Sequence, residues 1–496
     1  MYVNASNKDF KPTTASYIRV LQLTYAYCLL LPFPPSPKSN RYALFCMEPL
    51  QYSSSFTVFL LLLFLALSLF LEPFSMVNCK ALEQCLQKES SALLQLKRGF
   101  ITGELDTWQP GTACSSRVEI GAGPGPRPKQ SIHRRLTNLS ILNLSGALYI
   151  EKVPVGISRL TKLTSLDLSG NGYPLTANPI ILQNMSNLRV LNLDYVNLST
   201  YGVEWCGALT NYTPALAVLR MIDSSLSGYF PNEIFFLRNL KELDLSNNQM
   251  LSGSLSDFPE YSNLETLYLY GTNFSGNLPD TIGNLKFLTD LNLGECQFSG
   301  KIPTSMGNLS RLKWLYLSDN NFSGANTCLN GNLCNLKELD LSDNSFSGPI
   351  SASVFTLPAL EKLQLQQNQF SGQLGEFSNA SSMLTYVDLS NNKLQGQIPR
   401  SIFKLSGLQR LHLDSNNFSG VVGSEFIKGL KDLGWLSLSN NKLTEIPLFI
   451  KYQNNSFRLE LSKNKLTGAI PTFFCNLTNL ELLDLSDNKL IGSIPP

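Results

Sequence analysis

Residues that could carry out catalysis or bind a metal ion are scarce in this sequence. The chain has 2 histidines, His133 and His412, and neither has a cysteine or an aspartate at a ligand-like spacing. A catalytic triad needs a histidine between a nucleophile and a carboxylate, and a structural zinc site needs closely spaced Cys or His pairs. No glycine-rich phosphate-binding loop is present either. We therefore expect a protein that is not an enzyme and that has no cofactor and no metal site.

Groups suited to binding are better supplied. Aromatic side chains interleaved with charges lie at outward positions of three successive segments, and such residues often anchor protein interfaces. We predict that they form a ligand-binding patch, although aromatic residues are also simply well tolerated in strands. The patch residues are Glu265, Tyr268, Tyr270, Asp290, Asn292, Lys313, Trp314 and Tyr316, and Lys241, Glu242, Glu361, Lys362, Arg410, His412 and Trp435 extend the same surface.

Carboxylates recur at one position of neighbouring segments, at Asp244, Asp340, Asp388 and Asp484. The simplest interpretation is a row of solvated side chains, and the alternative is a part of the ligand surface. The whole chain carries 39 Lys and Arg against 37 Asp and Glu, a net charge of +2. This balance gives no reason to expect a nucleic-acid partner.

All these positions belong to an internal repeat with the pattern L-x-x-L-x-L-x-x-N. Its units begin at 139, 163, 188, 216, 240, 264, 288, 312, 336, 360, 384, 408, 433, 456 and 480, with an unbroken spacing of 24 from 216 to 408. We therefore predict about 15 repeats over residues 136–496.

One unit shows how the repeat should fold. After Leu336, the leucines Leu339 and Leu341 alternate with polar residues, which predicts a short strand with one buried face. Asn344 should bond backbone groups of the adjoining coil, Phe346 should fill the convex side of the core, and Gly348 should supply an unusual backbone angle.

A single unit cannot bury its own leucines, so the units must stack. The period and pattern are those of the leucine-rich repeat. The expected fold is an α/β repeat solenoid, a curved superhelix with a parallel β-sheet on its concave face.

Two cysteine questions arise from the repeats themselves. Cys296 replaces the repeat asparagine, so we expect a buried free thiol there. Cys328 and Cys334 lie six residues apart in a return segment, and they either pair with each other or remain two free thiols.

The N-terminal part predicts entry into the secretory pathway. The apolar run at 56–71 spans 16 residues, short for a membrane helix, so 47–78 is expected to be a signal peptide or a signal anchor. Residues 1–46 show no period and are expected to be a disordered or wrongly translated extension. The chain also contains Asn-x-Ser/Thr sequences, which are glycan acceptors in that compartment. The candidates are Asn184, Asn197, Asn211, Asn273, Asn308, Asn321, Asn379, Asn417, Asn454 and Asn476.

The segment after each strand reads F-S-G-x-I/L-P, for example at 274–279 and 298–303. This form resembles the plant-specific extracellular repeat, and the stretch from Cys85 to Trp108 looks like the plant repeat-capping domain. Together with Glu204-Trp205-Cys206, these motifs are similar to plant receptor-like proteins of the disease-resistance type, particularly the wilt-resistance group. The resemblance covers 85–114 and 136–496.

The sequence departs from this family in three places. The cap at 79–114 is incomplete, because only Cys114 remains where the family has more cysteines, so the resemblance implies at most a Cys85–Cys114 disulfide. Residues 115–135 are Gly-, Pro- and Arg-rich and show no repeat. The chain ends within a repeat, and we expect it to be truncated.

The resemblance implies an extracellular ectodomain that recognises a protein, peptide or glycan in pathogen perception. It further implies signalling through a partner receptor kinase and, for the full-length protein, attachment to the plasma membrane with the repeats outside the cell. Two alternatives remain. One is an inhibitor of microbial cell-wall-degrading enzymes that is secreted to the apoplast, and the other is a non-functional receptor fragment.

Overall fold

The computed structural model describes three strands near the N-terminus, a fourth strand at Arg117–Glu119, and residues 138–495 without 147–151, 154, 172–174, 326–332, 422–429, 431 and 453–454. The chain divides into two compact units, residues 1–79 and 80–496. The expected signal segment and the cysteines Cys85 and Cys114 of the expected cap lie outside the described residues.

The first unit contains a small antiparallel sheet of β1 (Arg19–Leu23), β2 (Ala26–Pro32) and β3 (Tyr42–Met47), in that order. These strands differ from a disordered extension, one of the two alternatives expected for residues 1–46, and the other, a wrongly translated extension, stays a prediction. Two apolar runs, at 26–32 and 42–47, flank a Pro- and Ser-rich connection, and such runs can pair as neighbouring strands.

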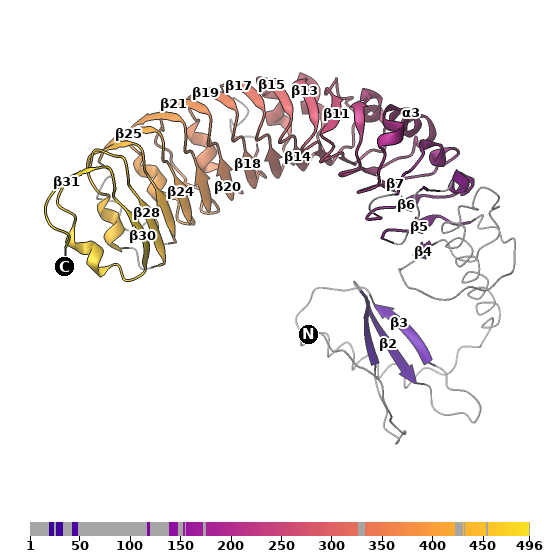
Figure 1. The fold of residues 1–496 in the computed structure, drawn as a ribbon, viewed down its shortest axis with the longest axis horizontal. Helices are drawn as coiled ribbons and strands as arrows, with labels where there is room; N and C mark the ends of the chain where they lie inside the picture. The colour runs from indigo at the N-terminus through magenta and orange to yellow at the C-terminus, as the bar shows by residue number, and fades with distance from the viewer. Residues whose placement is uncertain are drawn as a thin grey trace. The chain divides into compact units, whose positions relative to one another are not determined.

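The second unit is a curved solenoid whose strands stack in parallel (Figure 1). Each of the 15 predicted repeats contributes one strand to a 16-stranded sheet on the concave face, and most neighbouring strands pair leucine to leucine, with Val387 in place of a leucine in β22. The solenoid and its concave parallel sheet are thus confirmed. The sixteenth strand is β4 (Arg117–Glu119), which lies in the segment that showed no repeat and pairs with β5. The other fifteen are β5 (Ile141–Asn143), β6 (Ser165–Asp167), β7 (Val190–Asn192), β8 (Val218–Arg220), β10 (Glu242–Asp244), β12 (Thr266–Tyr268), β14 (Asp290–Asn292), β16 (Trp314–Tyr316), β18 (Glu338–Asp340), β20 (Lys362–Gln364), β22 (Tyr386–Asp388), β24 (Arg410–His412), β26 (Trp435–Ser437), β28 (Phe457–Glu460) and β30 (Leu480–Asp484).

The F-S-G segments form a second parallel sheet, which the sequence did not predict. It has ten strands, and β29 (Thr467–Gly468) and β31 (Lys489–Leu490) form a further pair. In most of these strands the glycine after the serine has a positive φ, +80° at Gly348, as expected from its place in the repeat, and Gly253 of β11 is an exception. The ten strands are β9 (Ser227–Tyr229), β11 (Met250–Gly253), β13 (Asn273–Asn277), β15 (Gln297–Gly300), β17 (Asn321–Ala325), β19 (Ser345–Gly348), β21 (Gln369–Gln373), β23 (Lys393–Gly396), β25 (Asn417–Gly420) and β27 (Lys442–Leu443).

The return segments form single turns of 3-10 helix. These are η2 (Val155–Arg159), η3 (Pro179–Leu182), η4 (Ser199–Tyr201), η5 (Asn232–Phe236), η6 (Asp280–Asn284), η7 (Thr304–Asn308), η8 (Ala352–Thr356), η9 (Arg400–Lys404), η10 (Leu448–Tyr452) and η11 (Thr472–Asn476). In the irregular unit that begins at 188, η4 is followed directly by an α-helix, α3 (Gly202–Tyr212), whose Trp205 is fully buried. The extra length of that unit makes room for the helix.

The core is one continuous cluster of leucines and phenylalanines along the stack. Phe298, Phe322, Phe346 and Phe370 are all fully buried, and successive rings stack with centroids 6.1 Å apart. This confirms the predicted role of Phe346 and shows that each ring packs against the equivalent ring of the next repeat.

The repeat asparagines join neighbouring coils. Asn368 Nδ2 donates to Leu341 O of the preceding coil at 2.8 Å, and its Oδ1 accepts the Phe346 N–H at 2.9 Å. Cys296 takes this position in its own coil, where it is buried with a free thiol whose Sγ donates to Leu269 O at 3.1 Å. The buried backbone groups at the ends of the strands are satisfied in this way.

Candidate functional site

The predicted patch lies on three adjacent strands of the concave sheet, β12, β14 and β16. The register places Asp290 beside Trp314, and Asn292 between Tyr268 and Tyr316. Glu265 and Lys313 are exposed directly before β12 and β16, and the three aromatic side chains of Tyr268, Trp314 and Tyr316 are half-buried. The structure therefore brings the predicted patch residues together on one face.

The tyrosine hydroxyls of the patch are held by carboxylates of the following repeat. Tyr268 donates to Asp290 Oδ1 at 3.1 Å, and Tyr316 donates to Glu338 Oε2 at 2.9 Å. Tyr270 makes the same kind of bond to Glu295. Sequence reasoning missed Glu295 and Glu338, although their distance of 22 or 25 residues from a tyrosine, close to one repeat, was a usable signal.

These contacts change the titration of the phenols. The hydrogen bond to Glu295 is the main reason why the pKa of Tyr270 rises to about 12. Burial raises the pKa of Tyr268 and of Tyr316, and the neighbouring carboxylates Asp290 and Glu338 raise it further. All three hydroxyls therefore keep their protons at neutral pH and remain hydrogen-bond donors with a fixed direction.

Charged residues of the patch also have defined partners. Lys241 Nζ lies 2.6 Å from Glu265 Oε1, and Lys313 Nζ lies 5.6 Å from the centroid of the Trp314 ring. Asn292 Oδ1 accepts the N–H of Gly294 at 3.1 Å. The Tyr270 ring packs directly over Gly294 in this turn, because a Cβ at Gly294 would lie only 3.2 Å from the ring.

The recurring aspartates Asp244, Asp340 and Asp388 are more than solvated side chains, because each accepts hydrogen bonds in the turn after its strand, whereas Asp484 makes the same bonds but lies more open to solvent. Asp340 Oδ1 accepts the N–H of Ser342 at 3.0 Å and its hydroxyl at 2.6 Å, and Asp388 binds Ser390 in the same way. Asp244 is buried, with 3% of its surface exposed. Burial raises the pKa of Asp244 and of Asp340 against the opposing effect of the serine hydrogen bonds. These carboxylates close the turn after the strand, so they serve the fold.

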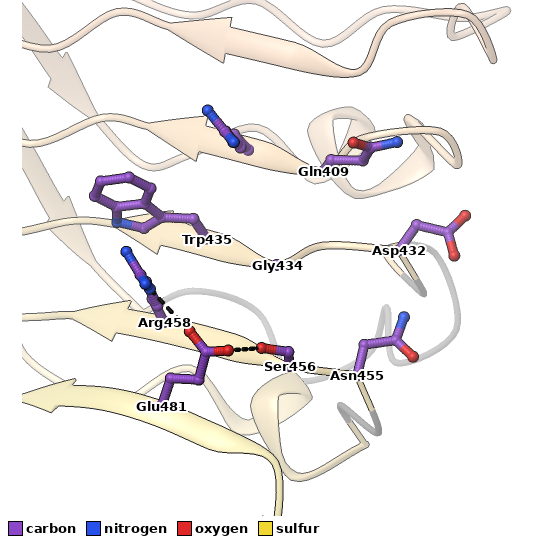
Figure 2. Close-up of a pocket in the computed structure, with 9 residues that line it drawn as sticks. Gln409, Asp432, Gly434, Trp435, Asn455, Ser456, Arg458 and Glu481 are labelled. Carbon is purple, nitrogen blue, oxygen red and sulfur yellow. Dashed lines mark hydrogen bonds and ion pairs between the residues drawn. The ribbon is translucent and has the colours of Figure 1, made fainter. Parts of the chain in front are cut away.

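A second group lies farther along the same face, around Trp435. The His412 ring is 4.7 Å from the Trp435 ring in an edge-on arrangement and 5.8 Å from the Tyr386 ring. Trp435 Nε1 donates to Glu460 Oε1 at 3.1 Å. A cavity of about 530 Å³ opens beside Trp435, and Figure 2 shows its lining.

The other predicted sites remain predictions. Cys334 lies exposed in the turn before β18, while Cys328 is outside the described residues. Of the glycan acceptors, Asn197 and Asn417 are half-buried and Asn454 is not described. The remaining seven acceptors are exposed, namely Asn184, Asn211, Asn273, Asn308, Asn321, Asn379 and Asn476.

Within the described part of the chain, no helix is long and apolar enough to cross a membrane. Within the same residues, no group of three or more His, Cys, Asp or Glu side chains is arranged to hold a metal ion.

The Leucine Rich Repeat family matches residues 239–260, 263–285, 287–309, 335–357, 383–405, 457–477 and 479–496, and a second description of the same repeat matches 159–172. Receptor-like protein 6 of Arabidopsis thaliana is 32% identical over 161 residues, which cover 31% of this chain and 16% of that protein. The matched part thus spans less than a fifth of the relative's length.

Solved structures of plant receptors have the same fold. The plant peptide hormone receptor RGFR1 in complex with RGF2 matches with a TM-score of 0.58 and 25% identity, over 72% of this chain and 64% of that one. The Arabidopsis receptor kinase HAESA, in complex with the peptide hormone IDA and the co-receptor SERK1, matches with a TM-score of 0.55 and 28% identity, over 73% and 68% of the two chains. The chain is therefore a leucine-rich-repeat protein related to the plant receptor-like proteins.

Proposed function

We propose that this chain is the ligand-recognition ectodomain of a plant receptor-like protein and that it binds a peptide or protein segment at the patch on β12, β14 and β16. The observation that carries the proposal is the set of half-buried aromatic rings whose hydroxyls are held by carboxylates one repeat away. Rigid aromatic side chains lose little entropy on binding and make good interface anchors.

The relatives support the class of ligand. Both solved neighbours described above are complexes with peptide hormones, and one of them also contains a co-receptor. By analogy, the proposed ectodomain lies outside the cell and acts in pathogen perception through a partner receptor kinase.

A peptide library displayed on phage tests the binding proposal. Clones are selected on the immobilised wild-type chain and then assayed on the Trp314→Ala/Tyr316→Ala variant. The control is Tyr229→Ala, because Tyr229 is 55% exposed on β9, in the other sheet. We expect selected peptides to lose at least about tenfold in affinity on the patch variant and to bind the control unchanged. Clones that bind all three proteins equally would rule out the patch.

The signalling part needs its own measurement. The complete receptor gene is expressed in leaves, and the reactive-oxygen burst and co-precipitation with receptor kinases are recorded with and without a microbial extract. We expect a response from the wild type that the patch variant lacks. A response of equal size from the wild type and the patch variant would mean that signalling does not need this patch.

A further inference from the structure

A groove runs across the concave sheet over the four strands β24, β26, β28 and β30, away from the aromatic patch. Three strands, β18, β20 and β22, lie between the two sites. With about 4.8 Å between strands, the groove spans about 14 Å. It is lined by Gln409, Arg410, Asp432, Gly434, Trp435, Asn455, Ser456, Arg458 and Glu481 (Figure 2).

The floor of the groove exists because one repeat lacks a side chain. The position after the first leucine of the repeat carries a long polar side chain in many units, for example Lys313, Lys337 and Gln409, but in this unit it is Gly434. The fold does not require glycine here. A Cβ would lie 3.5 Å from Ser456 O and 3.8 Å from Gln409 O, which is ordinary contact, and the φ of Gly434 is not positive. The missing side chain therefore opens a hollow without serving the backbone.

The walls of the groove are held in place by contacts with each other. Arg458 lies over the Trp435 ring, with its guanidinium carbon 5.6 Å from the ring centroid, and its Nε lies 3.0 Å from Glu481 Oε2. The hydroxyl of Ser456 donates to the other oxygen of Glu481 (Figure 2). The indole N–H of Trp435 is already bound to Glu460. A ligand would thus meet a preformed surface, which lowers the entropic cost of binding.

The chemistry of the lining indicates the class of ligand. Two arginines and two carboxylates cancel in formal charge, so the lining gives no net attraction to an ionic ligand. Among the described residues, no aliphatic side chain lines the groove, so an apolar peptide side chain would find no anchor. Guanidinium, carboxylate, amide and hydroxyl groups instead offer closely spaced donors and acceptors beside one aromatic ring.

We propose that the groove floored by Gly434 and walled by Trp435 and Arg458 binds a neutral oligosaccharide. Sugar hydroxyls can bond the guanidinium of Arg458 at one end of the groove and the amide of Gln409 and the carboxylate of Asp432 at the other, and the C–H face of a sugar ring packs against the indole of Trp435. This site goes beyond the proposed peptide recognition and does not depend on it.

The test titrates the full chain with cellohexaose, chitohexaose, laminarihexaose, mannohexaose, xylohexaose and maltohexaose, by calorimetry and by tryptophan fluorescence. The protein is first deglycosylated with an enzyme, because Asn454 begins an Asn-x-Ser sequence that includes Ser456. The test variant is Gly434→Gln, which restores the kind of side chain that Gln409 has one repeat away. The control variant is Trp314→Ala, in the separate aromatic patch.

We expect at least one of these neutral sugars to bind with a Kd of about 1 mM or tighter, Gly434→Gln to weaken it at least about tenfold, and Trp314→Ala to change it by less than about twofold. Circular dichroism should show both variants folded, and Gly434→Ala provides a second, smaller filling of the groove. Absence of binding to all six sugars at about 5 mM, or binding that Gly434→Gln leaves intact, would overturn the proposal. So would tighter binding of a galacturonate oligomer than of every neutral sugar. Because the patch variant is a control here, failure of peptide binding and failure of sugar binding can be told apart.

Discussion

Tyr316 and Glu338 are joined across one step of the concave sheet by a hydrogen bond of 2.9 Å. Lys362 from the next repeat reaches the other oxygen of the same carboxylate, also at 2.9 Å. One carboxylate thus connects three consecutive repeats and fixes the direction of the phenol. The same arrangement of a tyrosine and a carboxylate of the next repeat occurs at Tyr268 and Tyr270.

Replacing Tyr316 with Phe should remove this hydrogen bond while the ring stays in place. Because Glu338 keeps Lys362, we expect a loss of only about 1 kcal/mol in the free energy of unfolding. Urea unfolding of the wild type and of Tyr316→Phe measures it. A loss above about 3 kcal/mol would mean that Glu338 is left without a partner, contrary to the contact with Lys362.

Alkaline pH should weaken the fold through Tyr270. Its folded-state pKa of about 12 lies above the ordinary tyrosine value, so the folded chain holds the proton more tightly than the unfolded chain does. The corresponding stabilisation is complete below about pH 10 and is lost as the pH rises toward 12. The thermal unfolding temperature should fall less steeply with rising pH across this window for Tyr270→Phe than for the wild type. Identical slopes would argue against the bond to Glu295.

The asparagine ladder should be sensitive to truncation at Asn368. Asn368→Ala leaves the buried N–H of Phe346 and the carbonyl of Leu341 without this partner, so we expect a loss of about 3 kcal/mol. The matched variant is Cys296→Ala at the same position of another repeat, where only a weak thiol donor is removed. Cys296→Ala should lower the free energy of unfolding clearly less than Asn368→Ala does. Equal losses in denaturant unfolding would show that the amide bonds do not set the strength of the ladder.

The phenylalanine stack should tolerate a leucine better than an alanine. Phe346 packs between Phe322 and Phe370, with centroids 6.1 Å from each, and truncation to Ala should cost about 3–5 kcal/mol. Leu394 occupies the same position of another repeat and is fully buried, so Phe346→Leu should cost less than half as much. Calorimetric melting of both variants compares them. A leucine variant as unstable as the alanine variant would contradict this packing argument.

Much of the fold could be predicted because every repeat must bury the same leucines and satisfy the same backbone groups. The spacing of the leucines located every strand of the concave sheet from β5 to β30, and the asparagine and phenylalanine positions indicated what they do. The second sheet was missed because F-S-G has no alternation of its own. Its strands form only when neighbouring coils stack, which pairs Gly324 with Phe346 and Gly348 with Phe370 of the next coil.

The site could be predicted only in outline. Alternation along a strand placed Tyr268, Trp314 and Tyr316 on one face, but it could not show that Glu295 and Glu338 orient the hydroxyls, because those contacts cross from one repeat to the next. The aspartates have a different reason: Asp340 bonds Ser342 two residues later in a tight turn, and an outward position on the strand does not distinguish this bond from solvation. The groove at Gly434 depends on a missing side chain and on four strands at once.

The most direct test of the central claim is to map where a bound peptide lies. A peptide selected on the wild-type chain is synthesised with a photoreactive group and irradiated in its complex with the chain. Mass spectrometry then identifies the residues of the chain that are cross-linked to it. We expect cross-links within residues 265–316 on the concave face, and we expect them to be lost when Trp314 and Tyr316 are replaced by Ala. Cross-links confined to the second sheet or to the return helices would contradict it.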